Sequence, residues 1–322
     1  MPSRFELAEL ISRHVAADGE RATAIPGLLL YRRSEPLART PGIYEPSICI
    51  VAQGRKRMHY GDNSHTYDPD NYLISSLTLP AEAEIFGVSA DEPFLALILA
   101  VDRLLVSRLM IEMDAVSAAR ETFALPGICI SSPLTERLRL SLVRLLRLLD
   151  DPLDCSILAS NLLYELHYEV LRGPHGYLLR NCVYNDSRAN RIAPIVHYIE
   201  ENFHRPLDID TIARVAGMSA STLYQYFREV TSMSPMQFVK SLRLHQARRL
   251  LLSGSQASEA CYRVGYSSPS QFSREFKRFF GDLPSDVARN NSVRTGGRAA
   301  ILSPTVADRA VSGIGIRHRD PE

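Results

Sequence analysis

The feature that constrains this chain most is an imperfect internal repeat in its C-terminal third, between residues 190 and 288. Four positions of a first unit recur 48 or 49 residues later in a second unit, with one residue inserted after the glycine. The recurring pairs are Gly217 and Gly265, Leu223 and Phe272, Phe227 and Phe276, and Pro235 and Pro284. Repeats of one short helical unit predict that the same supersecondary motif occurs twice.

Serine residues indicate where the second helix of each unit begins. In the first unit, a helix predicted over residues 211–216 is followed by a glycine turn and by Ser219; in the second, a helix predicted over residues 257–264 is followed by Ser268. A serine at an N-cap accepts a hydrogen bond from a free backbone N–H of the first turn. Each unit is therefore predicted to be a helix-turn-helix.

A longer helix is predicted to join the two units. Ser234-Pro235-Met236-Gln237 and Ser268-Pro269-Ser270-Gln271 both have the order of a capping box with proline at the first helical position. The helix after Ser234 should run for about 18 residues to near Leu252, or about 27 Å. Successive major-groove faces lie about 34 Å apart, so this spacer suits two recognition helices in adjacent segments of one duplex.

Helical periodicity separates the inner and outer faces of the two recognition helices. Leu223, Phe227 and Val230 share one side of the first helix, and Phe272, Phe276 and Phe279 share one side of the second. The polar residues expected to face DNA are Ser221, Tyr224, Gln225, Arg228, Ser270, Arg274 and Lys277. We expect Arg274 to form two hydrogen bonds with guanine and Lys277 to contact a phosphate group.

This C-terminal third resembles the double helix-turn-helix domain of the AraC/XylS family over about 100 residues. The resemblance rests on RVGY at 263–266, FSREFKRFFG at 272–281 and LP at 283–284. It implies a transcription regulator, an activator, with double-stranded DNA and RNA polymerase as partners. It also implies base contacts at Ser221, Tyr224, Gln225, Ser270, Gln271 and Arg274. The first recognition helix departs from the family in having no Arg or Lys before Arg228, which predicts softer guanine recognition there.

Charge follows the same division of the chain. Residues 190–290 hold 13 Lys and Arg against 9 Asp and Glu, whereas residues 1–189 hold 19 against 24. A basic module attached to an acidic one fits a polyanionic partner for the basic part.

The N-terminal part shows short strand-like runs separated by turns, which predict an antiparallel barrel or sandwich. The runs are residues 28–31, 47–52, 72–77, 83–88 and 94–101. YEPSICIVAQGRK at 44–56 and YDP at 67–69 resemble the cupin-like regulatory domain of an AraC-type subgroup, over roughly residues 25–125. The resemblance implies a small effector of unspecified identity.

Two amphipathic helices are predicted after the β-rich part, over residues 134–149 and 156–171. Their leucine stripes suit packing against the β domain and suit a homodimer interface equally well. The predicted fold class is α+β with two domains, a cupin-like antiparallel barrel with a helical appendage and an all-α double helix-turn-helix. The expected divisions are an N-terminal helix (1–24), the regulatory domain (25–125), a helical linker (126–187), the DNA-binding domain (188–290) and a flexible tail (291–322).

Neither a metal nor another cofactor is expected. Only His59 and His65 lie in the barrel segment, on either side of a predicted hairpin turn, and such a pair is more often at the surface than in a metal site. The basic run at residues 55–57 could touch an acidic effector or DNA, although a solvated strand end is the simpler interpretation. Cys49 lies in an apolar run, where a buried thiol is commoner than a sensor of oxidants or electrophiles.

The cysteines and the absence of targeting patterns bear on location. Five widely spaced cysteines without a CxxC pair suggest neither a disulfide framework nor a zinc site. The N-terminus lacks the pattern of a signal peptide, and no stretch approaches the roughly 18 apolar residues of a membrane span. We therefore expect a cytoplasmic protein.

Three other kinds of function would each require a different feature of the sequence. A cupin-type enzyme carrying a DNA-binding tail would need convergent ligands or a nucleophile with its base, and neither arrangement is found. An alkyl-transfer repair protein would need an activated cysteine beside metal-ligating cysteines, and the five cysteines are scattered. An architectural DNA binder without signal input stays an alternative, against which the long β domain argues. No enzymatic activity is expected.

Overall fold

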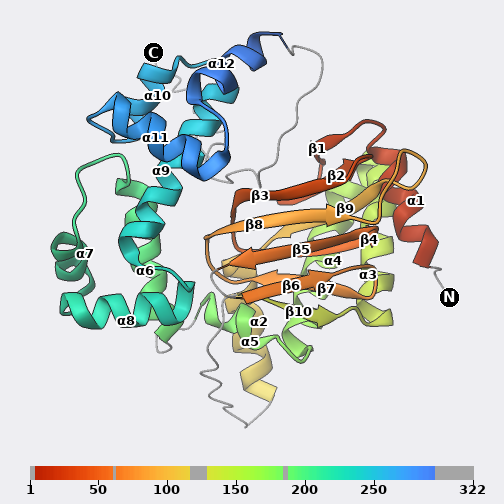
Figure 1. Cartoon of the computed structure of the whole chain (residues 1–322). Coiled ribbons are helices and arrows are strands. Elements are labelled where there is room, and N and C mark those ends of the chain that lie inside the picture. Colours follow the sequence, from red (N-terminus) through yellow and green to blue (C-terminus); the bar gives the residue numbers. More distant parts are fainter. Residues whose placement is uncertain (1–3, 61–62, 117–128, 184–187, 294–322) are drawn as a thin grey trace, which may run out of the picture.

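The computed structural model describes residues 4–60, 63–116, 129–183 and 188–293 of the chain. Figure 1 shows a β-rich part flanked by helices and a separate helical part that carries the C-terminal elements. Six strands form one sheet in the order β1-β2-β9-β4-β7-β10, and four form a second in the order β3-β8-β5-β6. Every strand pairing is antiparallel, as the predicted fold class requires.

The strands are β1 (Gly19–Ala22), β2 (Leu28–Arg33), β3 (Leu37–Tyr44), β4 (Ser47–Gln53), β5 (Arg55–Tyr60), β6 (Asn63–Tyr67), β7 (Asn71–Ser75), β8 (Leu79–Phe86), β9 (Phe94–Ala100) and β10 (Cys129–Pro133). The helices of the β-rich part are α1 (Arg4–His14), α2 (Arg103–Val116), α3 (Glu136–Arg147), α4 (Pro152–Arg172) and α5 (Tyr177–Asn181), with a 3-10 turn, η1 (Leu148–Asp150), after α3. The helices of the C-terminal part are α6 (Arg188–Asn202), α7 (Ile209–Ala216), α8 (Ala220–Thr231), α9 (Pro235–Leu252), α10 (Ala257–Arg263), α11 (Pro269–Phe280) and α12 (Pro284–Val293).

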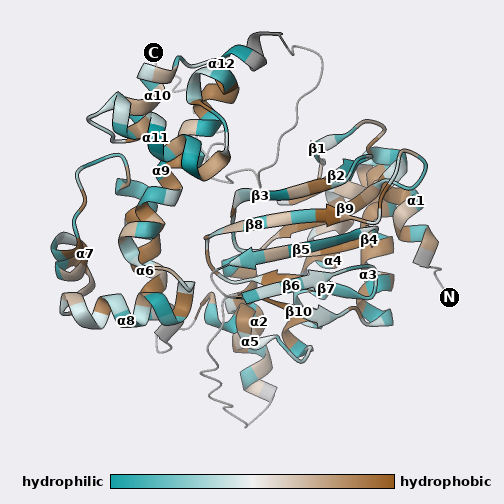
Figure 2. Cartoon of the chain, in the orientation of Figure 1, coloured by the Kyte–Doolittle hydropathy of each residue, from teal (hydrophilic) through white to brown (hydrophobic). Residues whose placement is uncertain are grey.

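The apolar runs of the sequence correspond to β2, β4, β7, β8 and β9. The predicted hairpin turn between His59 and His65 corresponds to the β5–β6 turn, whereas β1, β3 and β10 were not predicted. β5 and β6 are mostly polar because one face of their sheet is open to solvent, and Figure 2 shows β5 as hydrophilic. β3 contains Pro41 and Gly42, which weaken a strand pattern. β1 and β10 lie in segments expected to be helical, 1–24 and 126–187, yet they complete the two ends of the six-stranded sheet.

Alternation along β4 shows how the six-stranded sheet divides two cores. Ile48 and Ile50 belong to a cluster shared with α1, α3 and α4, which cover the outer face of the sheet. Cys49 and Val51 point the other way, into the space between the two sheets. A period of two along a strand buried on both faces produces this division.

The leucine stripes of α3 and α4 pack against the β-rich part, which was one of the two interpretations left open. Leu142 and Leu145 on α3 and Leu166 on α4 are buried in the cluster that also contains Ile48 and Ile50. The first turns of α4 behave differently and leave large apolar side chains exposed, namely Leu153, Ile157 and Leu158.

The C-terminal part has the predicted helical order. α7 and α8 form the first unit, α10 and α11 form the second, and α9 spans 18 residues and ends at Leu252 as expected. α12 continues to Val293, so the first three residues of the expected tail are helical, and residues 294–322 lie outside the described part. None of the described helices combines the length and the apolar character needed to cross a bilayer.

Two glycines with the same φ of 87°, Gly265 and Gly281, offer a matched test of the packing between the two units. A Cβ at Gly281 would meet nothing within 4 Å, whereas at Gly265 it would lie 2.6 Å from the carbonyl oxygen of His204. We predict that Gly281→Ala lowers the free energy of unfolding by about 1 kcal/mol, the usual cost of alanine at positive φ. Gly265→Ala should cost at least about 2 kcal/mol because backbone must also move. Urea denaturation followed by circular dichroism measures both, and equal losses would contradict the close approach.

Candidate nucleic-acid interface

The first recognition helix, α8, presents the predicted residues to solvent. Ser219 caps it by accepting a hydrogen bond from the backbone N–H of Thr222, which fixes where the helix begins and hence how it is turned. Leu223, Phe227 and Val230 are buried as predicted. The opposite face exposes the four predicted side chains, Ser221, Tyr224, Gln225 and Arg228.

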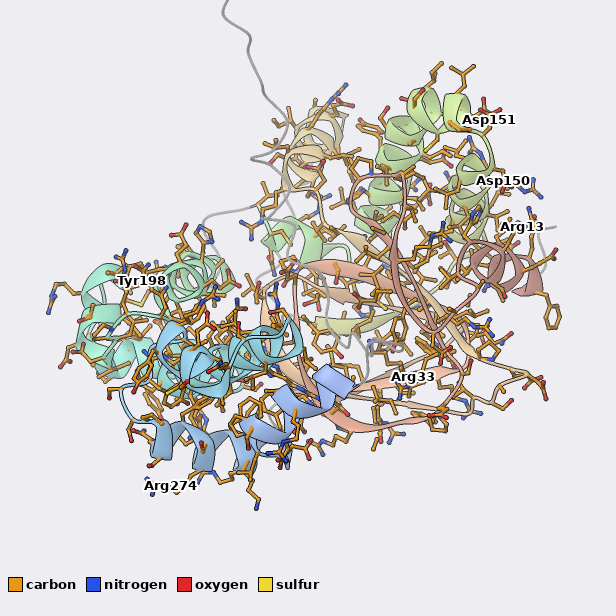
Figure 3. All side chains as sticks on the ribbon, turned by 90° about the horizontal axis from the view of Figure 1, so that it is seen from above. Arg13, Arg33, Asp150, Asp151, Tyr198 and Arg274 are labelled. Atoms are coloured by element: carbon orange, nitrogen blue, oxygen red, sulfur yellow. The ribbon has the colours of Figure 1, made fainter. Side chains whose placement is uncertain are left out.

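The second recognition helix, α11, repeats this arrangement. Ser268 caps it by accepting from the backbone N–H of Gln271, and Gly281 ends it in the left-handed conformation. Phe272 and Phe276 are buried, whereas Phe279, predicted to be inward, is only half-buried. The four predicted polar residues, Ser270, Gln271, Arg274 and Lys277, are exposed. Figure 3 shows Arg274 projecting from the outer edge of the helical part, away from the β-rich part.

The two capping boxes differ in the structure. At Ser234 the box is complete, because Gln237 accepts a hydrogen bond from the backbone N–H of Ser234 at 2.9 Å and its own N–H donates to the Ser234 hydroxyl at 3.2 Å. At Ser268 only the serine half of the box forms. Gln271 instead donates to Glu275 Oε1 at 3.2 Å, so its side chain lies along the exposed face of α11.

A matching glutamine–glutamate pair lies on α8, where Gln225 Nε2 donates to Glu229 Oε1 at 3.0 Å. This contact directs one N–H of the amide toward the carboxylate, leaving the amide oxygen and the other N–H as the groups Gln225 can offer to a base edge. An amide in that orientation suits the N6 and N7 atoms of adenine. Glu229 is not among the site residues predicted from sequence, although its spacing of four residues from Gln225 on a helix is a usable signal.

Arg243 on α9 holds the first unit to the second. Its Nε donates to the carbonyl of Phe203 at 2.7 Å and its Nη2 to the carbonyl of Arg205 at 2.8 Å, both in the loop between α6 and α7. The same guanidinium lies 5.9 Å from the ring centroid of Tyr266, in the turn before α11. We call Arg243, Tyr266, Gly265 and the loop at 203–205 the junction.

Glu275 extends the junction onto the recognition helix itself. The hydroxyl of Tyr266 donates to Glu275 at 2.9 Å, and the ammonium of Lys240 on α9 lies 3.0 Å from the same carboxylate. Burial raises the pKa of Glu275, but hydrogen bonds from Gln271, Lys240 and Tyr266 outweigh it and hold that pKa below its usual value. Glu275 is therefore ionised at neutral pH and ties α11 to the spacer helix.

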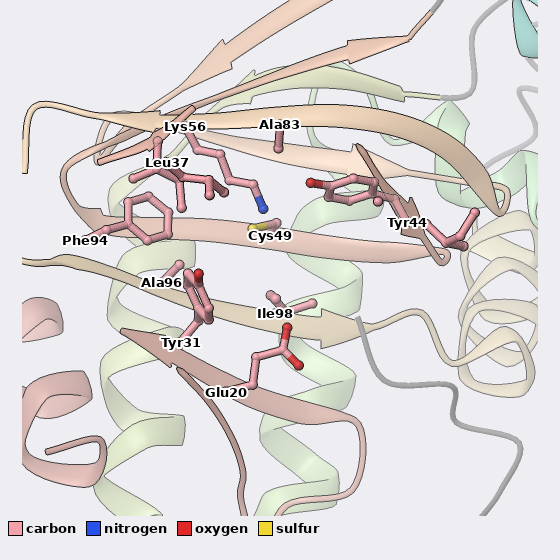
Figure 4. A pocket seen from close by; sticks show the side chains of 13 residues that line it. Glu20, Tyr31, Leu37, Tyr44, Cys49, Lys56, Ala83, Phe94, Ala96 and Ile98 are labelled. Carbon is pink, nitrogen blue, oxygen red and sulfur yellow. The ribbon is translucent and has the colours of Figure 1, made fainter. Parts of the chain in front are cut away.

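The β-rich part encloses a cavity between its two sheets, shown in Figure 4. Its lining includes apolar side chains of both sheets together with Tyr31, Tyr44, Cys49 and Lys56, and one acidic residue, Glu20. The simpler interpretation of the basic run at 55–57 was a solvated strand end. It is correct for the exposed Arg55 and the partly exposed Arg57 and wrong for Lys56, which the alternation of β5 turns toward the cavity.

The two histidines of the barrel lie on opposite faces of one hairpin. His59 pairs in register with Ser64, and His65 pairs with Met58, which puts their side chains on different sides of the sheet. His59 Nε2 lies 3.2 Å from Glu84, and His65 Nε2 lies 3.3 Å from the hydroxyl of Tyr60. Within the described residues, no three His, Cys, Asp or Glu side chains are grouped so that they could hold a metal ion.

Comparison with known proteins agrees with both halves of this structure. A family model described as the AraC-type transcriptional regulator N-terminus matches residues 24–178, and one described as a helix-turn-helix domain matches residues 212–290. The chain is 37% identical over 98 residues to the HTH-type transcriptional regulator GlxA of Rhizobium meliloti, covering 30% of each chain. It is 29% identical over 103 residues to the HTH-type transcriptional activator RhaS of Escherichia coli, covering 32% of this chain and 37% of RhaS. These matches span about a third of the relatives' length.

Solved structures show the same overall fold. An apo structure of ToxT from Vibrio cholerae covers 84% of this chain and 99% of ToxT, with a TM-score of 0.57 at 12% identity. A ToxT structure bound to a naphthalenyl butenoic acid covers 81% of this chain, with a TM-score of 0.56. The fold and the two family matches define a DNA-binding transcription regulator with an N-terminal regulatory domain. The chain belongs to the AraC/XylS family.

The junction generates a prediction about operator spacing. In a DNA site obtained by selection, inserting two base pairs between the half-sites turns one of them by about 70° around the duplex. Wild-type protein should then lose about tenfold or more in affinity, because the junction fixes how α8 and α11 are placed. Arg243→Met should lose about threefold or less on the same insertion, since the two units can adjust.

Arg172→Met is the matched control for Arg243→Met. The Arg172 guanidinium lies 5.6 Å from the ring centroid of Tyr168, so the substitution removes a similar cation–π contact from the regulatory part. This variant should keep the wild-type spacing dependence in a gel-shift titration. An equally steep spacing dependence in Arg243→Met would show that the junction does not set the spacing.

The burial of Cys49 predicts that its thiol reacts slowly, whereas the alternative hypothesis of a sensor of oxidants or electrophiles requires a reactive thiol. Cys49 is 7% exposed and burial raises the pKa of its thiol, so little of the reactive thiolate is present. In the folded protein it should resist iodoacetamide at mildly alkaline pH and become alkylated after unfolding in guanidinium, as followed by mass spectrometry. Rapid labelling of Cys49 in the folded protein would instead support a sensor.

Proposed function

We propose that this regulator reads two successive major-groove segments of one duplex, one with α8 and one with α11. The observation that carries the proposal is the exposure of all eight candidate side chains on two capped helices that the 18-residue helix α9 joins. A helix of that length is about 27 Å long, which suits groove segments about 34 Å apart.

The side chains divide into base-reading and phosphate-binding groups. In the second segment, Arg274 pairs with guanine, Ser270 and Gln271 contact neighbouring bases, and Lys277 meets phosphate. In the first segment, the bases are contacted by Ser221, Tyr224 and Gln225, and the DNA backbone is contacted by Arg228. Gln225, oriented by Glu229, favours adenine, which fits the softer guanine recognition expected for this helix.

We further propose that a small effector binds in the barrel cavity and changes DNA binding. The cavity is lined by Gly42, Ile43 and Tyr44 of β3 and by Ala83 and Ile85 of β8. The same two strands contact the DNA-binding part, β3 through α9 and α11 and β8 through α9. An effector that displaces this wall would move the spacer helix, and the acid-bound ToxT structure supports a small molecule as effector.

We infer three further properties from the family. Activation through RNA polymerase follows the description of RhaS as an activator. Homodimer formation would use the exposed apolar turns of α4 at Leu153 and Ile157. The functional division of the chain follows the expected boundaries, with the regulatory region at 25–125, the helical region at 126–187 and the DNA-binding region at 188–290.

Selection from a random duplex library tests the DNA reading directly. Wild-type protein should enrich two short motifs centred about one helical turn, 10 base pairs, apart. Arg274→Ala should lose the preference for guanine at one position, with a cost of about 1–3 kcal/mol on the wild-type site. Gln225→Ala should instead alter the other motif.

Lys277→Ala is the matched control for Arg274→Ala on the same helix. It should weaken binding to all sequences about equally and reduce the salt dependence by about one phosphate contact. If Arg274→Ala selects the same motifs as wild type, the assignment of the recognition face is wrong. Enrichment of no motif by wild-type protein would favour the architectural alternative.

A further inference from the structure

The two Ser-Pro-x-Gln caps of the DNA-binding part use their glutamines in opposite ways. At the start of α9, the amide of Gln237 turns back and accepts a hydrogen bond from the backbone N–H of Ser234 at 2.9 Å. At the start of α11, the amide of Gln271 turns forward, and its Nε2 donates to Glu275 Oε1 at 3.2 Å. The fourth residue after Gln237 is the buried Ser241, whereas the fourth residue after Gln271 is this carboxylate. An ionised acceptor forms a stronger hydrogen bond than a neutral one, so Glu275 determines where the Gln271 amide lies.

The carboxylate of Glu275 is itself held by two donors from outside α11. The Tyr266 hydroxyl donates to Oε2 at 2.9 Å, and the Lys240 ammonium lies 3.0 Å from the same oxygen. Burial and the hydrogen bond to Glu275 raise the pKa of Tyr266, so its hydroxyl stays protonated and donates. The spacer helix and the turn before α11 therefore hold Oε2, while Oε1 accepts from Gln271.

The contact with Glu275 fixes which amide groups of Gln271 remain for DNA. An ionised carboxylate only accepts hydrogen bonds, so the amide nitrogen of Gln271 must face Glu275. One of its two N–H groups is thereby used, and the amide oxygen and the second N–H remain. In the major groove adenine offers a donor at N6 and an acceptor at N7, whereas guanine offers two acceptors, N7 and O6. The held amide therefore matches adenine and lacks the second donor that guanine requires.

We propose that Glu275 is a positioning residue that sets the base preference of Gln271, directing it to adenine and away from guanine. Glu275 acts through the orientation of the neighbouring amide and contacts no base itself. This inference rests on the proposed reading of a groove segment by α11, and it specifies one base pair of that segment.

Glu275→Gln gives the sharpest test, because it should reverse the preference. Lys240 and Tyr266 both donate at the position of Oε2, so they should hold the carbonyl oxygen of the new amide there. Its NH2 group then lies at the position of Oε1 and donates to the amide oxygen of Gln271, which leaves both N–H groups of Gln271 for DNA. In selection from a random duplex library, the adenine preference of the wild type at one position should become a guanine preference, with the ratio of the two bases changing about fivefold or more.

Gln271→Ala identifies the affected position, because it should lose the adenine preference there. In the double variant with Glu275→Gln and Gln271→Ala, the guanine preference should disappear, since Glu275 acts through Gln271. Glu259→Gln is the matched control, because Glu259 pairs with Arg263 at 3.3 Å over the same four-residue spacing on α10, and it should leave the selected motif unchanged. An unchanged adenine preference in Glu275→Gln, or a guanine preference that persists without Gln271, would overturn the proposal. Loss of the adenine preference without the gain of guanine also contradicts it.

A measurement on the wild-type protein remains decisive even if Glu275→Gln does not fold. Placing 7-deazaadenine at the affected position removes the N7 acceptor and leaves base pairing intact. Because the second N–H of the held amide donates to N7, the wild-type protein should bind this duplex about fivefold more weakly. Gln271→Ala should bind both duplexes equally. Equal affinity of the wild-type protein for the two duplexes would show that Gln271 is not held in the orientation that Glu275 imposes.

Failure of this inference differs from failure of the proposed function. If the wild-type protein enriches no motif, the groove reading fails and this inference fails with it. If Arg274→Ala loses its guanine while Glu275→Gln keeps the adenine, α11 reads bases but Glu275 does not position Gln271.

Discussion

Burial of α9 on most of its surface is the constraint on which the DNA-binding part depends. Phe238, Val239 and Leu242 in its first half belong to the core of the first unit, and Leu244, Ala247 and Leu251 in its second half belong to the core of the second. One helix therefore contributes to two cores. Each recognition helix buries its apolar stripe in the same core as one half of α9, so its polar face must turn outward. The spacing of the two polar faces is thus a property of one rigid helix and the junction built on it.

The barrel likewise depends on one element that contributes to two cores, here the six-stranded sheet. The six-stranded sheet turns Ile48 and Ile50 to the helices and Cys49 and Val51 to the interior, so it is apolar on both faces. The four-stranded sheet is apolar inside and charged outside, with Arg39–Glu82 and Arg57–Glu84 pairs on its solvent face. Because of this asymmetry, the inward Lys56 is a basic side chain among mostly apolar cavity walls.

The two parts share a structural element. β3 and β8 form part of the cavity wall and also contact α9 and α11, so one pair of strands lies between the candidate effector and the candidate DNA interface. The core of the first unit is continuous with the barrel interior, whereas the second unit has a core of its own. A change in the barrel is therefore expected to reach the first unit and the spacer helix more directly than the second unit.

The helix-turn-helix pair, its caps and its outward faces could be predicted from the sequence, because these features depend on local periods and on serine, proline and glycine at fixed positions. Leu223, Phe227 and Phe272 could be assigned to the inner faces from spacing alone, and all three are buried. The pairing of β5 with β8, the inward position of Lys56 and the junction at Arg243 became visible only in the folded chain. Strand pairing and contacts between residues far apart in the chain fix these features, and a local pattern carries no record of such contacts.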